Sequence, residues 1–134
     1  MGNWIAGDPT VIAQILKIRG AYSPPPPAGF ISPVLWGVEG EVRQRFAEAG
    51  IAANKVICER ETFEFDFAGT PEAYVGVFRD YYGPTMNAFA AAAANGKEAD
   101  LERELVDLFE RQNTSTDAGR TILSATYLRV TVHV

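Results

Sequence analysis

The stretch 70–85 constrains the fold of this chain most. Thr70 predicts a helix N-cap, because its hydroxyl can accept a hydrogen bond from a first-turn amide, and Pro71 suits the first helical position. Gly83-Pro84 should end or sharply kink this helix, since proline removes a backbone donor and disfavours helical geometry in the residue before it. The segment between carries aromatic and apolar side chains at helical spacing, which predicts one broad face: Tyr74, Val75, Phe78, Tyr81 and Tyr82.

Four other segments have apolar residues at helical spacing. They cover 11–20, 39–49, 85–94 and 97–112. The first follows Asp8-Pro9, which we interpret as a cap and first turn. The last places its apolar residues on one face and its charges on the other, and the inward residues are Leu101, Leu105, Leu108 and Phe109.

Two segments alternate with the period of a β-strand. The strand predicted over 54–68 has Phe63, Phe65 and Phe67 on one face, whereas upstream the apolar residues have the opposite parity; a bulge or a change of environment near Arg60 would account for this. The strand predicted over 121–134 should pair antiparallel with the first. Its apolar face is expected to hold Ile122, Leu128, Val130, Val132 and Val134.

The predicted fold class is therefore α+β: a small, mostly antiparallel sheet of 54–68 and 121–134, covered by about four to five helices. Residues 3–6 are too short to classify and could be the tail of a strand. The run Pro24 to Pro27 favours polyproline II and is interpreted as a stiff spacer, with a ligand for a proline-binding domain as the other interpretation. A length of 134 residues predicts one domain, 1–134.

Composition excludes several classes of function. The net charge is −5 and basic residues do not cluster, which argues against a nucleic-acid partner. No apolar run approaches the roughly 20 residues of a membrane span, and no signal peptide is visible, so we expect a cytoplasmic protein without a membrane partner. With one cysteine and one histidine, neither an internal disulfide nor a cysteine- or histidine-rich metal site can form.

No motif for catalysis is recognisable. The chain contains no P-loop, nucleophile elbow, zinc motif or EF-hand, and no G-x-G turn to hold a nucleotide. His133 is expected at the surface or an edge, and Cys58 as a small apolar residue of a strand. Glu59 and Glu61 could act as general acid and base, but alternating glutamates usually form a solvated strand face. We assign no catalytic, cofactor-binding or metal-binding residue.

A resemblance emerges when several stretches are considered in their order along the chain. They are Asn3-Trp4 before a helix, the proline run, Ser32-Pro33-Val34-Leu35-Trp36-Gly37 with Glu41-Val42-Arg43, the phenylalanine strand, Tyr81-Tyr82-Gly83-Pro84-Thr85, then 105–113 and the strand from Tyr127. This succession resembles the C-terminal half of a class I S-adenosylmethionine-dependent methyltransferase of the UbiE-like small-molecule group, and it covers nearly the whole chain.

The resemblance implies the last strands of a larger sheet, with helices forming a substrate cap. The glycine-rich half that binds the cofactor in that family has no counterpart in this sequence, so S-adenosylmethionine would be bound only if a partner supplied the site. Trp4 would lie at the end of the strand that faces the reaction centre. The substrate-binding candidates, which could contact an apolar small molecule, are Trp4, Trp36, Tyr74, Phe78, Tyr81 and Tyr82.

Two functions remain open at this stage. The first is the substrate-cap part of a methyltransferase, which would not methylate alone and would need a partner chain carrying the N-terminal half. The second is a non-catalytic small-ligand-binding or dimerisation module derived from a methyltransferase. Strands taken from a larger sheet leave unpaired edges and an uncovered apolar face, so we also expect a homodimer where no such partner is present.

Overall fold

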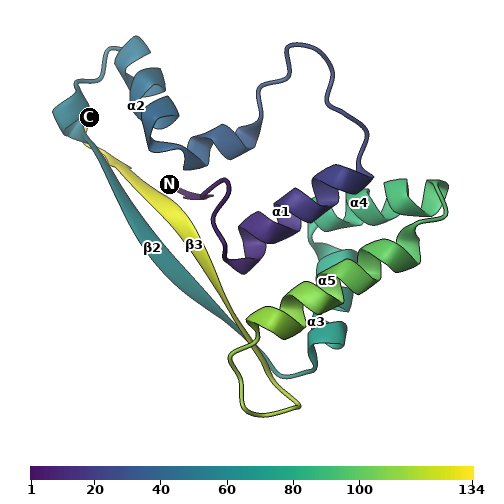
Figure 1. The fold of residues 1–134 in the computed structure, drawn as a ribbon. Coiled ribbons are helices and arrows are strands. Elements are labelled where there is room, and N and C mark those ends of the chain that lie inside the picture. Colours follow the sequence, from purple (N-terminus) through teal and green to yellow (C-terminus); the bar gives the residue numbers. More distant parts are fainter.

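The computed structural model describes residues 1–134, and it is built on a long ribbon of two antiparallel strands (Figure 1). The strands are β2 (Val56–Phe67) and β3 (Thr121–Val132), each of 12 residues, and the antiparallel pairing predicted from their alternation is confirmed. A third strand, β1 (Gly2–Trp4), pairs antiparallel with the middle of β3, which gives the order β1-β3-β2. The open interpretation of residues 3–6 is thus resolved in favour of a strand.

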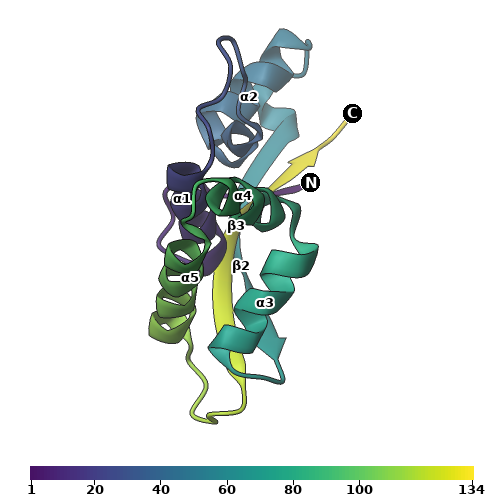
Figure 2. The ribbon, with the colours of Figure 1, turned by 90° about the vertical axis from the view of Figure 1, so that its right-hand side faces the viewer.

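Five α-helices lie on one side of the ribbon, in front of the strands in Figure 2. They are α1 (Val11–Tyr22), α2 (Glu39–Glu48), α3 (Pro71–Tyr81), α4 (Gly83–Ala94) and α5 (Glu98–Gln112). Two short 3₁₀ helices, η1 (Pro33–Gly37) and η2 (Ala53–Lys55), complete the chain. The α+β prediction and its number of helices are confirmed, although residues 54–55 belong to η2 rather than to the strand.

The break predicted at Gly83-Pro84 separates α3 from α4. Thr70 caps α3, because its hydroxyl accepts a hydrogen bond from the amide of Ala73 at 3.2 Å. Tyr82 is at once the residue after α3 and the N-cap of α4, and Pro84 lies in the first turn of α4. Proline is tolerated there because the N–H groups of a first turn have no acceptor within the helix, so the missing one costs no hydrogen bond.

The predicted aromatic face of α3 is correct except at one residue. Tyr74, Val75 and Phe78 are buried and Tyr82 is half-buried, but Tyr81 is 82% exposed. Its position one turn beyond Phe78 suits an inward side chain, yet at this end of the helix the next residue, Tyr82, packs against the core instead. The spacing alone could not reveal which of the two tyrosines faces the core.

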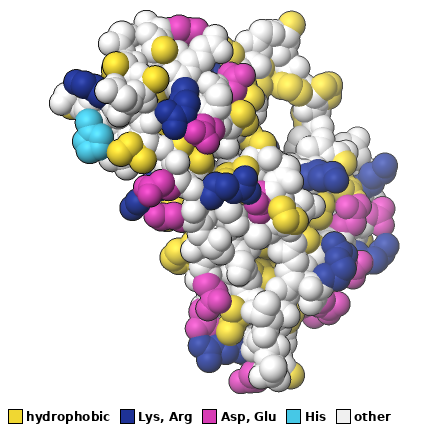
Figure 3. Space-filling view, turned by 60° about the vertical axis from the view of Figure 1, so that its left-hand side comes forward, with side chains coloured by type: hydrophobic (Ala, Val, Ile, Leu, Met, Phe, Trp, Pro, Cys, Tyr) yellow, Lys and Arg dark blue, Asp and Glu magenta, His cyan; other side chains and the backbone are white.

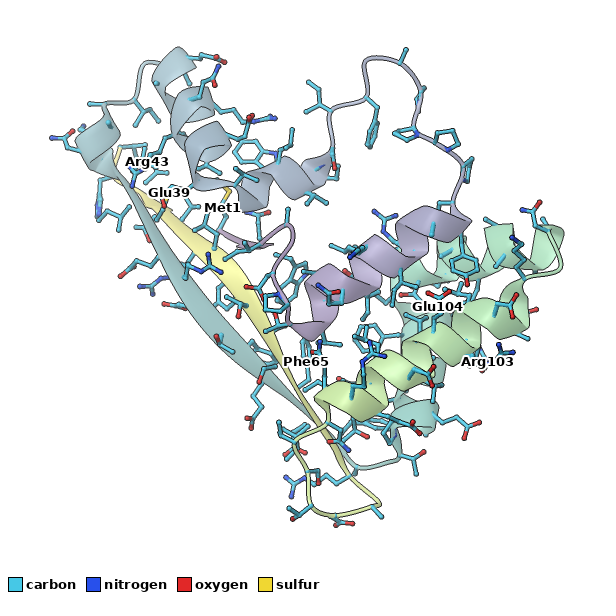
Figure 4. All side chains as sticks on the ribbon, viewed as in Figure 1. Met1, Glu39, Arg43, Phe65, Arg103 and Glu104 are labelled. Atoms are coloured by element: carbon cyan, nitrogen blue, oxygen red, sulfur yellow. The ribbon has the colours of Figure 1, made fainter.

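The main core lies between the Phe67 end of the ribbon and the helices α1, α3, α4 and α5. Phe65, labelled in Figure 4, points from β2 toward the helices. An aromatic cluster connects the layers: the ring of Phe67 stacks on Tyr74 at 4.4 Å, and Phe109 contacts Tyr74 and Phe78 edge-on at 5.7 and 5.3 Å. Such contacts add about 0.5–1.5 kcal/mol per pair beyond the area they bury.

A second core forms at the other end of the ribbon, under α2. It contains Val42, Val56, Leu128 and Val130, with Trp36 and Phe46 packed against it. Strand residues of even number face this core, whereas the main core takes the odd-numbered Phe65, Phe67, Leu123 and Ala125.

This change of face explains the parity problem of the sequence. The pairing of β2 with β3 keeps one register from Val56 to Phe67, so there is no bulge. A two-stranded ribbon twists strongly, and helices on one side of it therefore meet opposite faces at its two ends. The single apolar face predicted for 121–134 is wrong for the same reason, because Leu123 and Ala125 are buried while Val134 is fully exposed.

Asp8 joins the start of α1 to the sheet. This buried carboxylate accepts hydrogen bonds from the amide of Thr10 at 2.9 Å and from Arg60 at 3.0 Å, and the Thr10 hydroxyl accepts from the amide of Thr126 at 2.9 Å. The N-cap of α1 is Thr10, so the predicted cap at Asp8-Pro9 lies two residues too early. The role of Asp8 is to hold the helix on the strands.

At its other end, α1 is joined to α5. The hydroxyl of Tyr22 donates a hydrogen bond to Glu104, labelled in Figure 4, at 2.5 Å. This bond, assisted by burial and by the negative charge of Glu104, raises the pKa of Tyr22 to about 12. The phenol therefore stays protonated and keeps donating throughout the physiological range.

Candidate functional site

The edge strand β1 presents the first candidate side chain, Trp4. Its ring is half-buried, 6.1 Å from Tyr127 and 6.3 Å from Phe65, so the sheet fixes one side of it. The helix η1 passes directly over β1, where Gly37 is buried against the Trp4 carbonyl. The backbone of Trp4 is therefore held between a strand and a helix.

The joint between α3 and α4 brings Tyr82 to the same place. Burial raises the pKa of the Tyr82 phenol, while the positive charge of Arg19 and the neighbouring indole N–H of Trp4 act in the opposite direction. These two opposing effects mean that the phenol, the guanidinium and the indole share one environment. Three distant stretches of the sequence meet here.

A hollow of about 280 Å³ lies at this meeting point. Its walls come from β1, the middle of α1, the start of η1 and the start of α4, and they include Asn3, Trp4, Arg19, Val34, Tyr82 and Pro84. This is near the lower end of the volumes typical of small-molecule sites, and its mixture of aromatic walls with two polar side chains suits a small apolar ligand with one polar group.

A second hollow of about 220 Å³ opens on the sheet face beside β1. It is lined by Gly2, Trp4, Phe63 and Tyr127. Phe63 is 52% exposed, so the first of the three predicted inward phenylalanines is covered incompletely by the chain's own helices. Trp4 belongs to both hollows, which makes it the central residue of the candidate site.

The structure brings together only part of the predicted substrate-binding set. Trp4 and Tyr82 line the 280 Å³ hollow, whereas Tyr74 and Phe78 lie in the main core and Tyr81 points to solvent. Trp36 belongs to the second core, where it contacts Phe46 and has the guanidinium of Arg45 over its ring at 4.9 Å. Trp36 and Tyr81 therefore do not share a site with the others.

Sequence reasoning missed two polar residues of the site. Arg19 looks like an ordinary cation in the last turn of a helix, which favours that position anyway. Asn3 was considered only as part of a short strand. Nothing local distinguishes either, and only the packing of α1 against β1 reveals that both line one hollow.

The other residues considered for acid–base or metal chemistry, Glu59, Glu61, Cys58 and His133, line neither hollow. Glu59 and Glu61 lie on a solvated strand face, where both are paired with Arg129 at 2.6 and 3.0 Å. Figure 3 shows acidic and basic side chains interspersed over the face it presents. His133 is exposed, Cys58 is half-buried with its pKa raised by burial, and no three potential metal ligands gather anywhere in the chain.

The residues present do not form a site for S-adenosylmethionine by themselves. No acidic side chain lines either hollow, and Glu61, beside the second, already accepts from the hydroxyl of Tyr127 at 2.6 Å and pairs with Arg129. The glycines with positive φ (Gly7, Gly29, Gly50 and Gly96) lie outside both hollows. The arrangement can enclose an apolar ring and contact a polar group. No helix of the fold combines the length and apolarity that crossing a membrane requires.

Comparisons with protein-family models, with curated proteins and with solved structures found no match to this chain. The functional interpretation therefore depends on the residues of the site and on the resemblance described above, which lies in the order of several stretches along the sequence.

Proposed function

We propose that this chain is the C-terminal, substrate-cap part of an S-adenosylmethionine-dependent small-molecule methyltransferase, and that a partner supplies the cofactor site. The observation that carries the proposal is the position of the aromatic hollow beside a sheet face that the chain's own helices cover incompletely. β1 pairs only with β3, and the same strand contributes Trp4 to both hollows.

An incompletely covered apolar face beside β1 favours covering elements from outside the fold. Because η1 already contacts the outer side of β1 at Trp4, a partner would pack on the sheet face, where it would enclose Phe63 and Tyr127. The ligand of the partner would then lie against the hollow that holds Tyr82.

In this proposal the chain contributes orientation rather than acid–base chemistry. Trp4 and Tyr82 bind the apolar body of the methyl acceptor, and the enclosing walls exclude water. Holding two reactants in alignment can supply a large part of the rate of a bimolecular reaction. Aromatic faces also attract a cation by about 0.5–2 kcal/mol per contact, which suits the sulfonium centre that a bound cofactor would supply.

The test combines the chain with the N-terminal, cofactor-binding half of a UbiE-like methyltransferase. Alone, the chain should give no calorimetric signal with S-adenosylmethionine or S-adenosylhomocysteine. With the N-terminal half it should form a complex that binds S-adenosylmethionine at micromolar concentration and transfers a labelled methyl group to a small apolar acceptor. Tyr82→Ala should reduce the transfer without weakening cofactor binding, because Tyr82 lines the acceptor hollow.

Two results would contradict the proposal. If the chain alone bound S-adenosylmethionine at micromolar concentration, it would hold a cofactor site that its residues do not indicate. If the two halves neither associated nor transferred a methyl group, the alternative of a non-catalytic binding or dimerisation module would be favoured, since that module needs only the exposed sheet face and the hollow.

Without its partner, the chain should self-associate through the sheet face beside β1 that holds Phe63 and Tyr127. We expect light scattering at micromolar concentration to give about twice the chain mass of 14.6 kDa. Phe63→Ser should shift the equilibrium toward the monomer, because Phe63 is an exposed aromatic residue of that surface. Tyr81→Ser is the matched control, since Tyr81 is also exposed but lines neither hollow. A monomeric mass for the unaltered chain would rule out the dimer.

A further inference from the structure

The hollow that contains Trp4 and Tyr82 is basic, in a protein that is acidic overall. The net charge of the chain is −5, yet no Asp or Glu lines this hollow. An adjoining hollow of about 350 Å³ shares Leu16, Arg19 and Val34 with it, adds Lys17, and also lacks an acidic side chain. The positive charge of Arg19 is therefore not neutralised from the walls of either hollow.

Arg19 differs from most arginines of the fold in having no partner. Six others form ion pairs with carboxylates: Arg43, Arg60, Arg79, Arg103, Arg120 and Arg129. The side chain of Arg19 is half-buried and makes no hydrogen bond; its Nε is covered, so a ligand in the hollow would meet the terminal N–H groups of the guanidinium. Because these groups carry the charge and have no acceptor within the fold, the position favours an acceptor from outside the chain.

Asn3 lines the same hollow. Its Nδ2 has no hydrogen-bond partner but is covered by the fold, as are the Nε of Arg45 and the hydroxyl of Thr85, neither of which lines the hollow. Arg19 is therefore the donor that the hollow presents to a ligand.

The remaining walls are flat and apolar. Trp4 and Tyr82 contribute aromatic surfaces, and Pro84 and Leu16 add aliphatic ones. Planar apolar walls select a planar apolar body, whereas the guanidinium of Arg19 selects an acceptor of negative charge. Only one cation lines the hollow itself, which suits a monoanion better than a dianion such as a phosphate monoester.

We infer that this hollow binds a small planar monocarboxylate, with its carboxylate on the terminal N–H groups of Arg19 and its ring against Trp4 and Tyr82. Guanidinium groups bind carboxylates through paired N–H donors, which adds orientation to affinity. That this carboxylate is the methyl acceptor rests on the proposed function. That the hollow binds a carboxylate does not depend on it. The inference deepens the proposal by assigning the acceptor a charge that the aromatic residues alone do not indicate.

Calorimetric titration of the purified chain with 2-naphthoate and with its neutral analogue 2-naphthamide tests the inference. Naphthoate should bind in the submillimolar range and more tightly than naphthamide. Arg19→Met should weaken naphthoate binding by about tenfold or more, the effect of losing one hydrogen bond to a charged group, and should leave naphthamide binding unchanged. Arg103→Met is the matched control, because Arg103 is an exposed arginine on α5 that lines neither hollow.

A second variant keeps the test decisive if Arg19→Met does not fold, as judged by circular dichroism. Asn3→Asp places a negative charge beside the carboxylate, and it should weaken naphthoate binding while sparing naphthamide. The inference is overturned if naphthoate does not bind at millimolar concentration, if naphthamide binds as tightly, if both variants bind naphthoate like the unaltered chain, or if phenyl phosphate binds more tightly than naphthoate.

The two proposals fail in different ways. Methyl transfer with the N-terminal half but no binding of naphthoate would overturn the carboxylate site and leave the proposed function standing. Binding of naphthoate that depends on Arg19, without methyl transfer in the combined halves, would overturn the proposed function and support the carboxylate site.

Discussion

Replacing Phe109 by alanine should lower the free energy of unfolding by about 3–5 kcal/mol, the range measured when a buried aromatic side chain is truncated. Phe109 is 0% exposed and lies at the centre of the aromatic cluster, with edge-on contacts to Tyr74 and Phe78 at 5.7 and 5.3 Å. Alanine would leave a cavity between α3 and α5 that neighbouring rings could fill only by leaving their own positions. Urea denaturation followed by far-ultraviolet circular dichroism measures the loss.

The control for this prediction is Phe30→Ala. Phe30 has the same side chain, but it is 55% exposed, makes no ring contact and lines neither hollow. We expect it to lose no more than about 0.5 kcal/mol, since truncation of an exposed side chain creates no cavity. Equal losses of unfolding free energy in the two variants would mean that the burial of Phe109 in the aromatic cluster adds nothing to stability. A native stability of only about 5–15 kcal/mol makes the difference easy to resolve.

The sequence predicts the helices of this protein well because their signals are local. The cap at Thr70, the break at Gly83-Pro84 and the apolar stripe of 97–112 depend on residues within a few turns of one another, and all three are confirmed. The antiparallel strand pair follows in the same way from period-two alternation. Local chemistry is sufficient wherever the partner of a residue lies on the same element.

The prediction fails where the partner lies on another element. The twist of the ribbon decides whether the odd-numbered or the even-numbered residues of β3 are buried. Leu123 is buried while Ile122 is only half-buried, although the two side chains are equally apolar. Tyr81 has the spacing of a buried residue and the exposure of a free one because the tyrosine that follows it packs against the core instead. Arg19 and Asn3 lack any local signal, and they become site residues only when α1 packs beside β1.

The sequence does not reveal that position 37 must be glycine. Replacing Gly37 by alanine is the second change from which we expect a large loss of stability. A Cβ added to Gly37 would lie 1.9 Å from the carbonyl oxygen of Trp4 and 2.8 Å from its carbonyl carbon. Both are backbone atoms of a paired strand, so no side-chain rotation relieves the clash. Gly37→Ala must therefore separate η1 from β1, and we expect a loss at or above the upper end of the roughly 1–3 kcal/mol typical of overpacked sites.

Gly40→Ala is the matched control, because Gly40 lies three residues further along, in the first turn of α2, and an added Cβ there meets nothing within 4 Å. Alanine should leave the stability unchanged or raise it by up to about 1 kcal/mol, since glycine is the poorer helix former. Equal stabilities of the two variants in urea denaturation would mean that η1 does not press on β1. A selective loss in Gly37→Ala would show that η1 and β1 are fixed to each other. Since Val34 of η1 and Trp4 of β1 are both walls of the candidate site, that contact sets the shape of the hollow.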